Sequence, residues 1–539
     1  MKASPKGILL VHAPTGDSEL LFRGAPMSLL YAISVLAENL QRGLYKDWGR
    51  DDLRLYDPAL DCASDPPRAL AEIEQLLELH KPIVVGIGTT SYALYWALEI
   101  ARVVKRWDQR CIIIFGGPHE DEAGALSLGG SIADHSDVVD FSIQGDAEYL
   151  LERLFSILHA HKFGAAKAKS VLLAEADVFA AMQGSGAISF SEGESLRTVL
   201  IGRKYRPGLR TRGPIPLNLD SLPQPPRWLL DHRHEYLFDV FTEGRRPKRT
   251  AQMLTTRGCD FGCTFCTERG AVSHRNVQGI MDEIYSLRRQ GYEAIFFDDS
   301  TFHLYPYLSD LLNELAAVRE ELRMDFGCLT RVDTLVKELP KLPLARFADA
   351  GFNYFYLGIE HDDDVVLKEM QKGYDRAKLR SCLDLFRDTD FRLGVSLLFG
   401  FNSETEESRK RTLVLVAEHP AIVLANLSIV AFHPAAQLVR SKKKMLRYDV
   451  IPPNLDPAWD LFEEGRWFHP DHITLDYARS IHRLVCEVEV ETNGGLIRKL
   501  KRARNVLGPR VLAEKERQDY AGTLTAGEVA ADRNGHYRK

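Results

Sequence analysis

The feature that most restricts how this chain can fold is a strand-then-helix alternation repeated six times after residue 250. The six strand candidates are short apolar runs: QMLTTRG, AIFFDDS, MDFGCLTR, YFYLGIE, RLGVSLLFG and LANLSIVAF. Amphipathic segments lie between them, as in 277–290, where Val277, Ile280, Ile284 and Leu287 share one helix face. Strands separated by helices predict a parallel sheet. Six such units predict a partial (β/α)6 TIM-like barrel with its functional residues where the strands end.

The first 160 residues show the same alternation around a separate core. Their strand candidates are GILLVHA, LRLYD, PIVVGIGTTS, CIIIFGG and VVDFSIQG. This pattern predicts a doubly wound, Rossmann-like α/β domain that binds ligands beyond the carboxyl ends of its strands. The tips at those ends are rich in glycine and small polar residues: Gly88, Thr89, Thr90, Ser91, Gly116, Gly117 and Gly145. Any sheet of this kind needs small residues in its turns, so the tips alone leave a structural role open.

The chain has 539 residues, too many for one hydrophobic core, and we expect four parts. Residues 1–160 are expected to form the Rossmann-like domain and residues 251–435 the barrel. Residues 161–250 lose the alternation and contain the proline-rich run PIPLNLDSLPQPPRWLLD, which predicts a linker. Residues 436–539 are expected to be mostly helical, with a disordered polar tail.

Composition excludes several classes of function. Lys and Arg number 69 against 75 Asp and Glu, for a net charge of −6, so the chain lacks the basic excess of a nucleic-acid-binding protein. No segment approaches the roughly 18 apolar residues that span a bilayer, and GILLVHA is too short for a signal peptide. Five of the 8 cysteines are scattered singly, unlike a disulfide framework, which indicates the reducing cytoplasm.

The other three cysteines lie together in TTRGCDFGCTFCTERG, immediately after the first barrel strand. Structural zinc normally takes four protein ligands, and the nearest further candidate, His274, lacks the usual spacing. A redox pair of Cys263 and Cys266 would leave Cys259 unexplained. Three thiolates on one tight loop suit a [4Fe–4S] cluster with one iron left open to an external ligand.

The CxxxCxxC loop, with Phe265 before its last cysteine, resembles that of the radical S-adenosylmethionine enzymes over about residues 250–435. The first domain, with its GGP and QGDAE turns, is similar to the cobalamin-binding domain that precedes this core in one large subclass. The resemblance implies that the open iron holds S-adenosylmethionine, whose reductive cleavage gives a 5′-deoxyadenosyl radical. It also implies a small-molecule substrate and an external electron donor of the flavodoxin or ferredoxin type.

The resemblance also implies which residues hold S-adenosylmethionine. Asp298 and Asp299 match the second-strand position that holds the methionine end. Arg331 matches a position that pairs with the cofactor carboxylate, and Glu360 matches the GxE element near the ribose and amine. Each has a structural alternative: Asp299 as a helix cap, for example, or Arg331 as a partner of Asp333.

For cobalamin, the resemblance points to the seven small residues of the Rossmann-like tips. The D-x-H-x-x-G motif that ligates cobalt from below is absent, since His12 lacks the paired Asp, and this predicts a lower face without a histidine ligand. The alternative is a degenerate domain that serves as a lid.

These features lead to one principal hypothesis, a cobalamin-dependent radical methyltransferase. It would methylate an unactivated carbon of a small biosynthetic substrate, using methylcobalamin and a 5′-deoxyadenosyl radical. The motifs leave open a radical cyclisation, rearrangement or ring contraction without net methylation. A third class is a cofactor-sensing protein without turnover. No catalytic side chain is singled out by the motifs.

Overall fold

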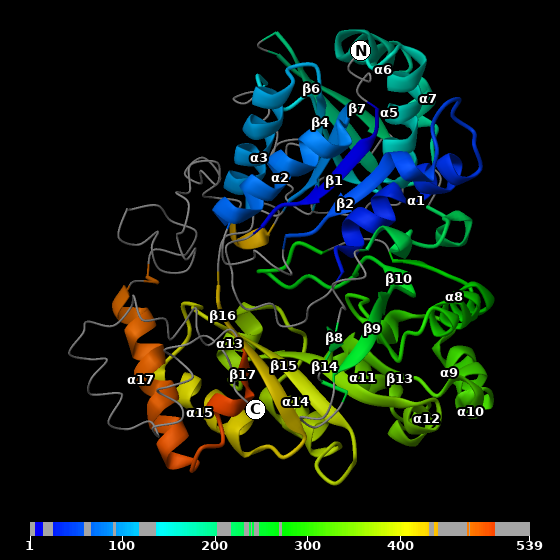
Figure 1. Cartoon of the computed structure of the whole chain (residues 1–539). Coiled ribbons are helices and arrows are strands. Elements are labelled where there is room, and N and C mark those ends of the chain that lie inside the picture. The colour runs from blue at the N-terminus through cyan, green and yellow to red at the C-terminus, as the bar shows by residue number, and fades with distance from the viewer. Residues whose placement is uncertain are drawn as a thin grey trace. The chain divides into compact units, whose positions relative to one another are not determined.

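The computed structural model describes most of the chain (Figure 1). The described residues are 6–14, 25–58, 66–89, 93–117, 136–193, 195–201, 217–230, 237–238, 240–241, 247–268, 272–430, 436–439, 472–473 and 475–501. The chain divides into two compact units, each described by itself below. The first unit comprises Met1–Leu329, Leu342–Phe352 and Phe432–Leu455, and the second comprises Thr330–Lys341, Asn353–Ala431 and Asp456–Lys539.

The first unit begins with a seven-stranded sheet in the order β2-β1-β3-β4-β5-β6-β7. Its strands are β1 (Ile8–His12), β2 (Leu53–Tyr56), β3 (Val84–Gly88), β4 (Ile112–Gly116), β5 (Phe141–Gly145), β6 (Gly186–Glu192) and β7 (Ser195–Ile201). The first five pair in parallel, whereas β6 and β7 run antiparallel at one edge. The parallel part confirms the predicted Rossmann-like α/β domain.

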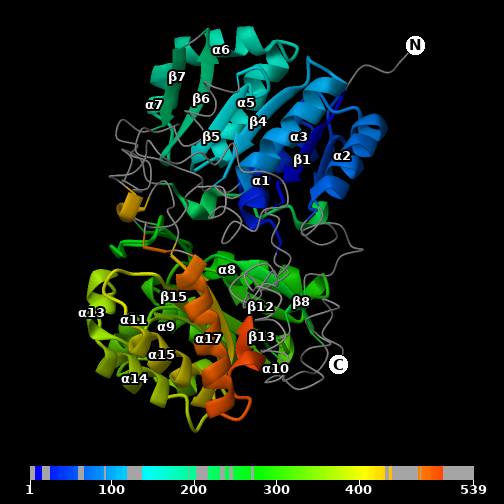
Figure 2. The ribbon, with the colours of Figure 1, turned by 90° about the vertical axis from the view of Figure 1, so that its left-hand side faces the viewer.

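Helices cover both faces of this sheet (Figure 2). They are α1 (Met27–Gln41), α2 (Pro66–His80), α3 (Leu94–Trp107) and α5 (Glu148–Ala160). Leu10 of β1 shares one buried core with Ile33 of α1 and Leu154 of α5. Val11 and Ile87, which alternate onto the opposite face, are also buried. Burial of successive strand residues on both faces is what makes these strands continuous apolar runs.

The expected linker at 161–250 is corrected by the structure for its first part. Residues 165–201 form α6 (Ala165–Ala174), α7 (Ala176–Ala180) and the strands β6 and β7. The polar residues that alternate through GAISFSE and SLRTVLI hid these strands, because an antiparallel edge needs fewer apolar positions than a buried parallel strand. The proline-rich part, described at 217–230, forms two short 3-10 turns, η3 (Leu219–Ser221) and η4 (Arg227–Leu229).

The first unit continues with the first strands of the predicted barrel. Its remaining elements are β8 (Leu237–Phe238), β9 (Lys248–Met253), β10 (Thr256–Arg257), β11 (Ser273–His274), α8 (Val277–Arg289), β12 (Ala294–Phe297), η5 (Phe302–Leu304), α9 (Leu308–Ala317), α10 (Arg319–Leu322), β13 (Asp325–Thr330) and α12 (Leu344–Asp349). β12 pairs in parallel with β9 and with β13. Asn276 begins α8, because its side chain accepts a hydrogen bond from Gly279 N at 2.7 Å. Three predicted strands are thus confirmed.

The second unit contains the other three predicted strands. Its elements are α11 (Val332–Glu338), β14 (Phe352–Glu360), α13 (Asp364–Glu369), α14 (Arg376–Asp384), β15 (Arg392–Phe399), α15 (Glu406–Glu418), β16 (Ile422–Ile429), α17 (Leu475–Glu491), η9 (Ile497–Lys499) and β17 (Leu500–Lys501). The strands β14, β15, β16 and β17 follow one another in parallel. The C-terminal region therefore contributes a short strand as well as the expected helix.

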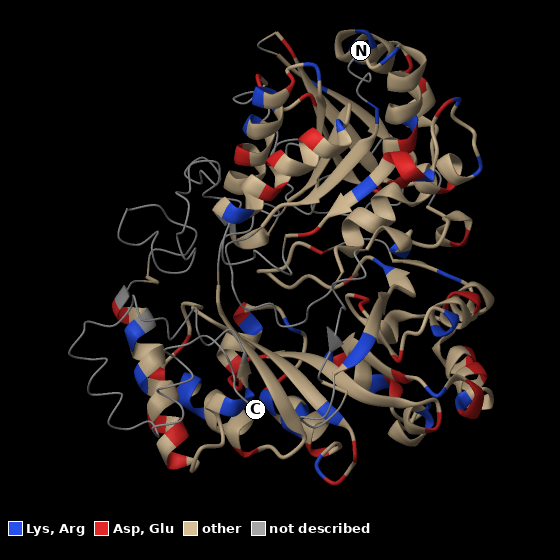
Figure 3. Ribbon diagram, in the orientation of Figure 1, with Lys and Arg blue, Asp and Glu red and all other residues tan. Residues whose placement is uncertain are grey.

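Charged residues of both signs alternate along the helices (Figure 3). Among the described residues, the structure has no helix with the length and apolar character needed to cross a bilayer.

Candidate cofactor site

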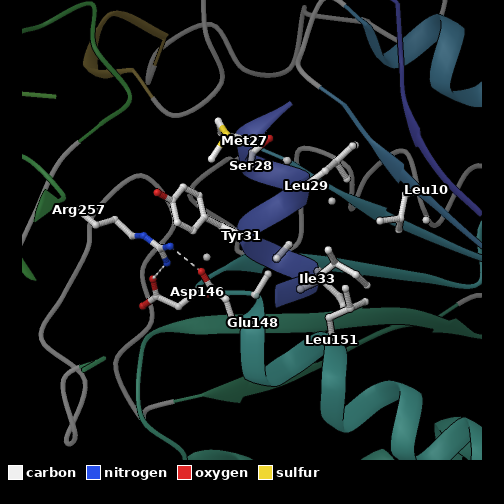
Figure 4. Close-up of a pocket in the computed structure, with 18 of the residues that line it drawn as sticks. Leu10, Met27, Ser28, Leu29, Tyr31, Ile33, Asp146, Glu148, Leu151 and Arg257 are labelled. Atoms are coloured by element: carbon white, nitrogen blue, oxygen red, sulfur yellow. Dashed lines mark hydrogen bonds and ion pairs between the residues drawn. The ribbon is translucent and has the colours of Figure 1, made fainter. Parts of the chain in front are cut away.

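Residues from both predicted cofactor domains line one cavity of about 420 Å³ in the first unit. One side of its wall comes from α1 and the Rossmann-like strands. The other side comes from the chain between Gln252 and Gly258, together with Thr267, Glu268 and Asp298. Figure 4 shows the α1 side of this space, with the side chain of Arg257, the last residue of β10, pointing toward it.

Four of the predicted corrinoid residues meet at this cavity. We call them the glycine rim: Gly88, Gly116, Gly117 and Gly145. Thr89 is buried, and its N–H donates a hydrogen bond to Gly116 O at 2.8 Å. Thr90 and Ser91 lie outside the described residues. The structure thus brings together the glycines of three separate strand ends.

Gly117 is the rim position where glycine is required. Its φ is +141°, and a Cβ built there would lie 1.9 Å from Thr89 O. The neighbouring Gly116 differs, since its Cβ would meet only Ile143 O at 3.6 Å, an ordinary contact. The chain after β4 therefore lies too close to the chain after β3 for a side chain at Gly117.

Apolar side chains line the interior of the cavity beneath α1. They include Leu10, Ile33, Ile114, Ile143, Leu151 and Phe155. Among the described lining residues there is no histidine. His12 lies at the end of β1, and its Nδ1 is 3.1 Å from Asp57 Oδ1, so it has an acidic partner that the local sequence did not reveal. This wall suits a large ligand with an extensive apolar surface.

The three predicted cluster ligands lie on the segment 258–268, which we call the cysteine loop. Cys259 and Cys263 are each 7% exposed, Cys266 is half-buried, and none of the three is in a disulfide. The N–H of Cys266 donates to Cys263 O at 3.2 Å, which closes a tight turn. Burial raises the pKa of Cys266 to about 11.

Asp299 fixes the chain that leads into this loop. The carboxylate is fully buried and accepts hydrogen bonds from Thr255 N at 2.9 Å, Thr255 Oγ1 at 3.0 Å and Thr256 Oγ1 at 2.9 Å. Thr256 N donates to it as well. We call residues 252–257 the stem of the cysteine loop. Asp299 holds the stem rather than capping a helix, and its contact with S-adenosylmethionine stays a prediction.

Asp298 differs from its neighbour because it lines the cavity and is only partly buried. One carboxylate oxygen accepts a hydrogen bond from Gln252 Nε2 at 2.8 Å. Burial, and next to it the charge of Asp299, raises the pKa of Asp298 to about 7. A carboxyl group that changes charge near neutral pH therefore borders the cavity.

In the second unit, Glu360 ends β14 with a left-handed backbone, φ +59°. Its carboxylate accepts hydrogen bonds from Lys372 Nζ at 3.1 Å and Ser396 Oγ at 2.9 Å. Lys372 follows Gln371, whose φ is +56°, and so the QKG turn brings a buried cation back to the strand end. Sequence reasoning missed Lys372, because no local spacing links it to Arg331 or Glu360. A strained, charged strand end is typical of functional sites.

Arg331 joins the same cluster. Its guanidinium donates to both carboxylate oxygens of Asp333, at 2.9 and 3.0 Å, and also to Lys372 O. Arg331 thus pairs with Asp333, as the structural alternative expected. However, only 6% of Arg331 is exposed, so this ion pair is buried on the arginine side and does not lie on the open surface. The second unit brings Arg331 and Glu360 together through Lys372, and their binding of S-adenosylmethionine stays a prediction.

Comparison with known sequences identifies the kind of domain that the strands and helices after residue 250 form. Residues 253–416 match the Radical SAM superfamily. The chain contains a radical SAM domain. The uncharacterized methyltransferase PH0819 of Pyrococcus horikoshii is 23% identical over 443 residues, which cover 80% of this chain and 82% of that protein. The ribosomal protein uS12 methylthiotransferase RimO of Flavobacterium johnsoniae is 29% identical over 235 residues, 39% of this chain, and this match spans about half of RimO.

Solved structures show the same fold over most of the chain. The radical S-adenosylmethionine methyltransferase TsrM of Kitasatospora setae, with cobalamin and a [4Fe–4S] cluster bound, has a TM-score of 0.53 at 17% identity. The match covers 80% of this chain and 77% of TsrM. The cobalamin-dependent enzyme OxsB, with aqua-cobalamin and S-adenosylmethionine bound, gives 0.54 at 14% identity and covers 90% and 67%. The predicted α/β fold, a Rossmann-like domain followed by a partial barrel, is confirmed.

A radical SAM domain implies an iron–sulfur cluster and S-adenosylmethionine, and the cysteine loop has the chemistry to hold the cluster. It offers three cysteine side chains, none of them in a disulfide, on one short loop. Among the described residues, no three His, Cys, Asp or Glu side chains converge on one point, as ligands of a single ion would. In a [4Fe–4S] cluster each thiolate would bind a different iron atom.

The carboxyl group of Asp298 should make the radical SAM domain sensitive to pH. From the predicted contact between Asp298 and S-adenosylmethionine, we expect the affinity for this ligand to rise as the pH increases through about 7, because only the carboxylate form of Asp298 attracts an ammonium group. Titration calorimetry between about pH 6 and about pH 8 measures this change. Asp298→Asn should bind S-adenosylmethionine more weakly at the upper pH, by about 1–3 kcal/mol, and its affinity should not show the rise through about pH 7. Equal pH profiles for the two proteins would contradict the assignment.

The same shift has an opposite effect on stability. A raised folded-state pKa means that the contribution of Asp298 to stability is present at low pH and is lost as the pH rises through about 7. Asp298→Asn should therefore melt at a higher temperature than the wild type at about pH 8, provided that no ligand is present.

Proposed function

We propose that the protein is a cobalamin-dependent radical methyltransferase that methylates an unactivated carbon of a small biosynthetic molecule. One observation carries the proposal: the glycine rim and the stem of the cysteine loop line the same cavity. A cavity shared by both cofactor domains would place a methyl donor beside a radical source. The methyltransferase name of the Pyrococcus relative and the cobalamin bound in TsrM and OxsB support it.

The residues of the chain divide the work between them. When bound, S-adenosylmethionine and the cluster supply a radical that removes a hydrogen atom, and the corrinoid supplies the methyl group. Cys259, Cys263 and Cys266 would hold the cluster, while the backbone of the glycine rim would admit a flat corrin ring. The apolar wall beneath α1 would exclude water from the reacting groups.

Asp298 of the first unit would bind a polar group of S-adenosylmethionine, and the roles of Arg331 and Glu360 in the second unit stay predictions of the resemblance. A carboxylate suits its ammonium group, and a guanidinium suits its carboxylate. Asp299 would act indirectly, because its hydrogen bonds hold the stem that leads into the cysteine loop. We further propose that the protein works in the cytoplasm on a small-molecule substrate. It would receive electrons from a donor of the flavodoxin or ferredoxin type.

The proposal is tested with anaerobically reconstituted protein, cobalamin, a strong reductant and S-adenosylmethionine that carries a trideuteriomethyl group. Metabolite extracts serve as the source of substrate. We expect bound corrinoid, both S-adenosylhomocysteine and 5′-deoxyadenosine, and a product with the labelled methyl group. 5′-Deoxyadenosine without S-adenosylhomocysteine would instead support a radical cyclisation or rearrangement. A wild-type protein that holds no corrinoid would overturn the proposal.

A further inference from the structure

The largely apolar cavity has one charged corner, formed by Arg257, Asp146 and Glu148 (Figure 4). Arg257 Nη2 lies 2.6 Å from Glu148 Oε1, and Nη1 lies 3.4 Å from Asp146 Oδ1. The side chains are 12%, 2% and 9% exposed for Arg257, Glu148 and Asp146. A guanidinium thus bridges two carboxylates in a largely desolvated place. Such a bridge needs the planar fork of arginine.

The two carboxylates and the arginine come from different cores. Asp146 and Glu148 follow β5 in the Rossmann-like domain, next to Gly145 of the glycine rim. Arg257 is the last residue of the stem and stands two positions before Cys259. Glu148 and Arg257 are 109 residues apart in the sequence. The ion pair therefore joins the chain that follows the rim to the stem that leads into the cysteine loop.

Tyr31 of α1 makes a second connection at the same place. Its hydroxyl accepts a hydrogen bond from Leu254 N at 3.2 Å, and its ring lies 5.4 Å from the guanidinium carbon of Arg257. The Rossmann-like domain thus contacts the stem at Leu254 and at Arg257, and Asp299 holds the two threonines between them.

We propose that Arg257 is a positioning residue, which fixes the cysteine loop against the glycine rim through its ion pair with Glu148 and Asp146. Its role for the loop rests on the radical SAM domain, and its role for the corrinoid rests on the function proposed above. Glu148 Oε2 is buried without a hydrogen-bond partner among the described residues, so Arg257 is the group that compensates the Glu148 charge. Removing either partner leaves a buried charge uncompensated and frees the stem to move.

The test changes the Rossmann-like domain and measures the cluster. Glu148→Gln keeps the shape of the side chain but removes its charge. Arg257→Lys keeps the charge but loses the fork that reaches two carboxylates. Reconstituted without corrinoid, both variants should retain iron but show shifted electron paramagnetic resonance of the reduced cluster with S-adenosylmethionine bound. Cleavage to 5′-deoxyadenosine should slow roughly a hundredfold, the effect of displacing a reacting group by about 1 Å.

Arg197→Ala is the matched control. Arg197 also forms an ion pair with a glutamate of the same sheet, Glu192 at 2.8 Å, but both side chains are half exposed at the β6–β7 edge. This variant should keep the wild-type spectrum and rate, because exposed pairs contribute little. Wild-type spectra and rates in both Glu148→Gln and Arg257→Lys would overturn the proposal. A wild type that binds no corrinoid defeats the proposed function alone, since these measurements contain none.

Discussion

Replacing Cys259, Cys263 or Cys266 with Ala is expected to remove the iron–sulfur cluster completely. Three thiolates hold three of the four iron atoms and leave only the fourth open for S-adenosylmethionine. The loss of any one thiolate therefore leaves a second iron atom without a protein ligand. The wild type, reconstituted anaerobically, should hold about four iron atoms per chain and absorb broadly near 400 nm. Iron and sulfide analysis of the three variants should give values near those of the protein before reconstitution.

Cys382→Ala provides the control for these variants. Cys382 lies in α14 of the second unit, is fully buried and, like the others, is not in a disulfide. Its replacement tests the loss of a buried sulfur without changing the cysteine loop, and this variant should reconstitute normally. A folded Cys382→Ala protein without a cluster, or a cysteine-loop variant that keeps one, would show that the three-ligand assignment is wrong.

Gly117→Ala is expected to abolish corrinoid binding while radical formation continues. The added Cβ would lie 1.9 Å from Thr89 O and 2.9 Å from Thr89 C, and backbone atoms cannot rotate away as a side chain can. The positive φ of +141° adds strain for any other residue. We expect the substitution to destabilise the folded conformation of this strand end by roughly 3 kcal/mol or more. Methyl transfer should stop, but 5′-deoxyadenosine should still form, because the cysteine loop belongs to the other core.

Gly116→Ala isolates this effect from a simple change at the rim. The two glycines are adjacent and both line the cavity, yet the Cβ at Gly116 meets nothing nearer than Ile143 O at 3.6 Å. This variant should keep corrinoid, measured by its visible absorption after desalting. Equal loss in both variants would mean that a side chain anywhere on the rim blocks the ligand. Retention in both would remove the rim from the corrinoid site.

Local patterns in the sequence were sufficient for the order of the elements. The patterns that indicate the six barrel strands and the cysteine loop involve residues a few positions apart, so periodicity and spacing reveal them. The six strands are β9, β12, β13, β14, β15 and β16. The hairpin of β6 and β7 escaped because half of its side chains are polar and one strand pairs at the edge of the sheet. Short, mixed strands carry too few apolar positions to stand out from a linker.

The contacts that organise the site could not be predicted in the same way. Asp299 was visible as an acidic residue at a strand end, but its partners Thr255 and Thr256 lie more than forty positions earlier. Arg257 stood inside the quoted motif, yet its partner Glu148 belongs to another core. These pairs form only when segments far apart in the sequence come together in the fold. A single sequence does not show which distant segments do so. For Arg331, the structure revealed Lys372 as a neighbour that no spacing rule contains.

The strand β17 has a consequence for how the chain is made. β16 ends at Ile429, and the segment that covers its outer edge begins only at Leu500, beyond α17. During synthesis the backbone groups of Ala425 and Asn426 therefore stay unpaired on that side until residue 500 has left the ribosome. An uncovered strand edge is a template for pairing with another chain. The last pairing in the second unit thus spans a long loop, which makes it slow to form. A nascent chain therefore presents this uncovered strand edge to other chains throughout that interval.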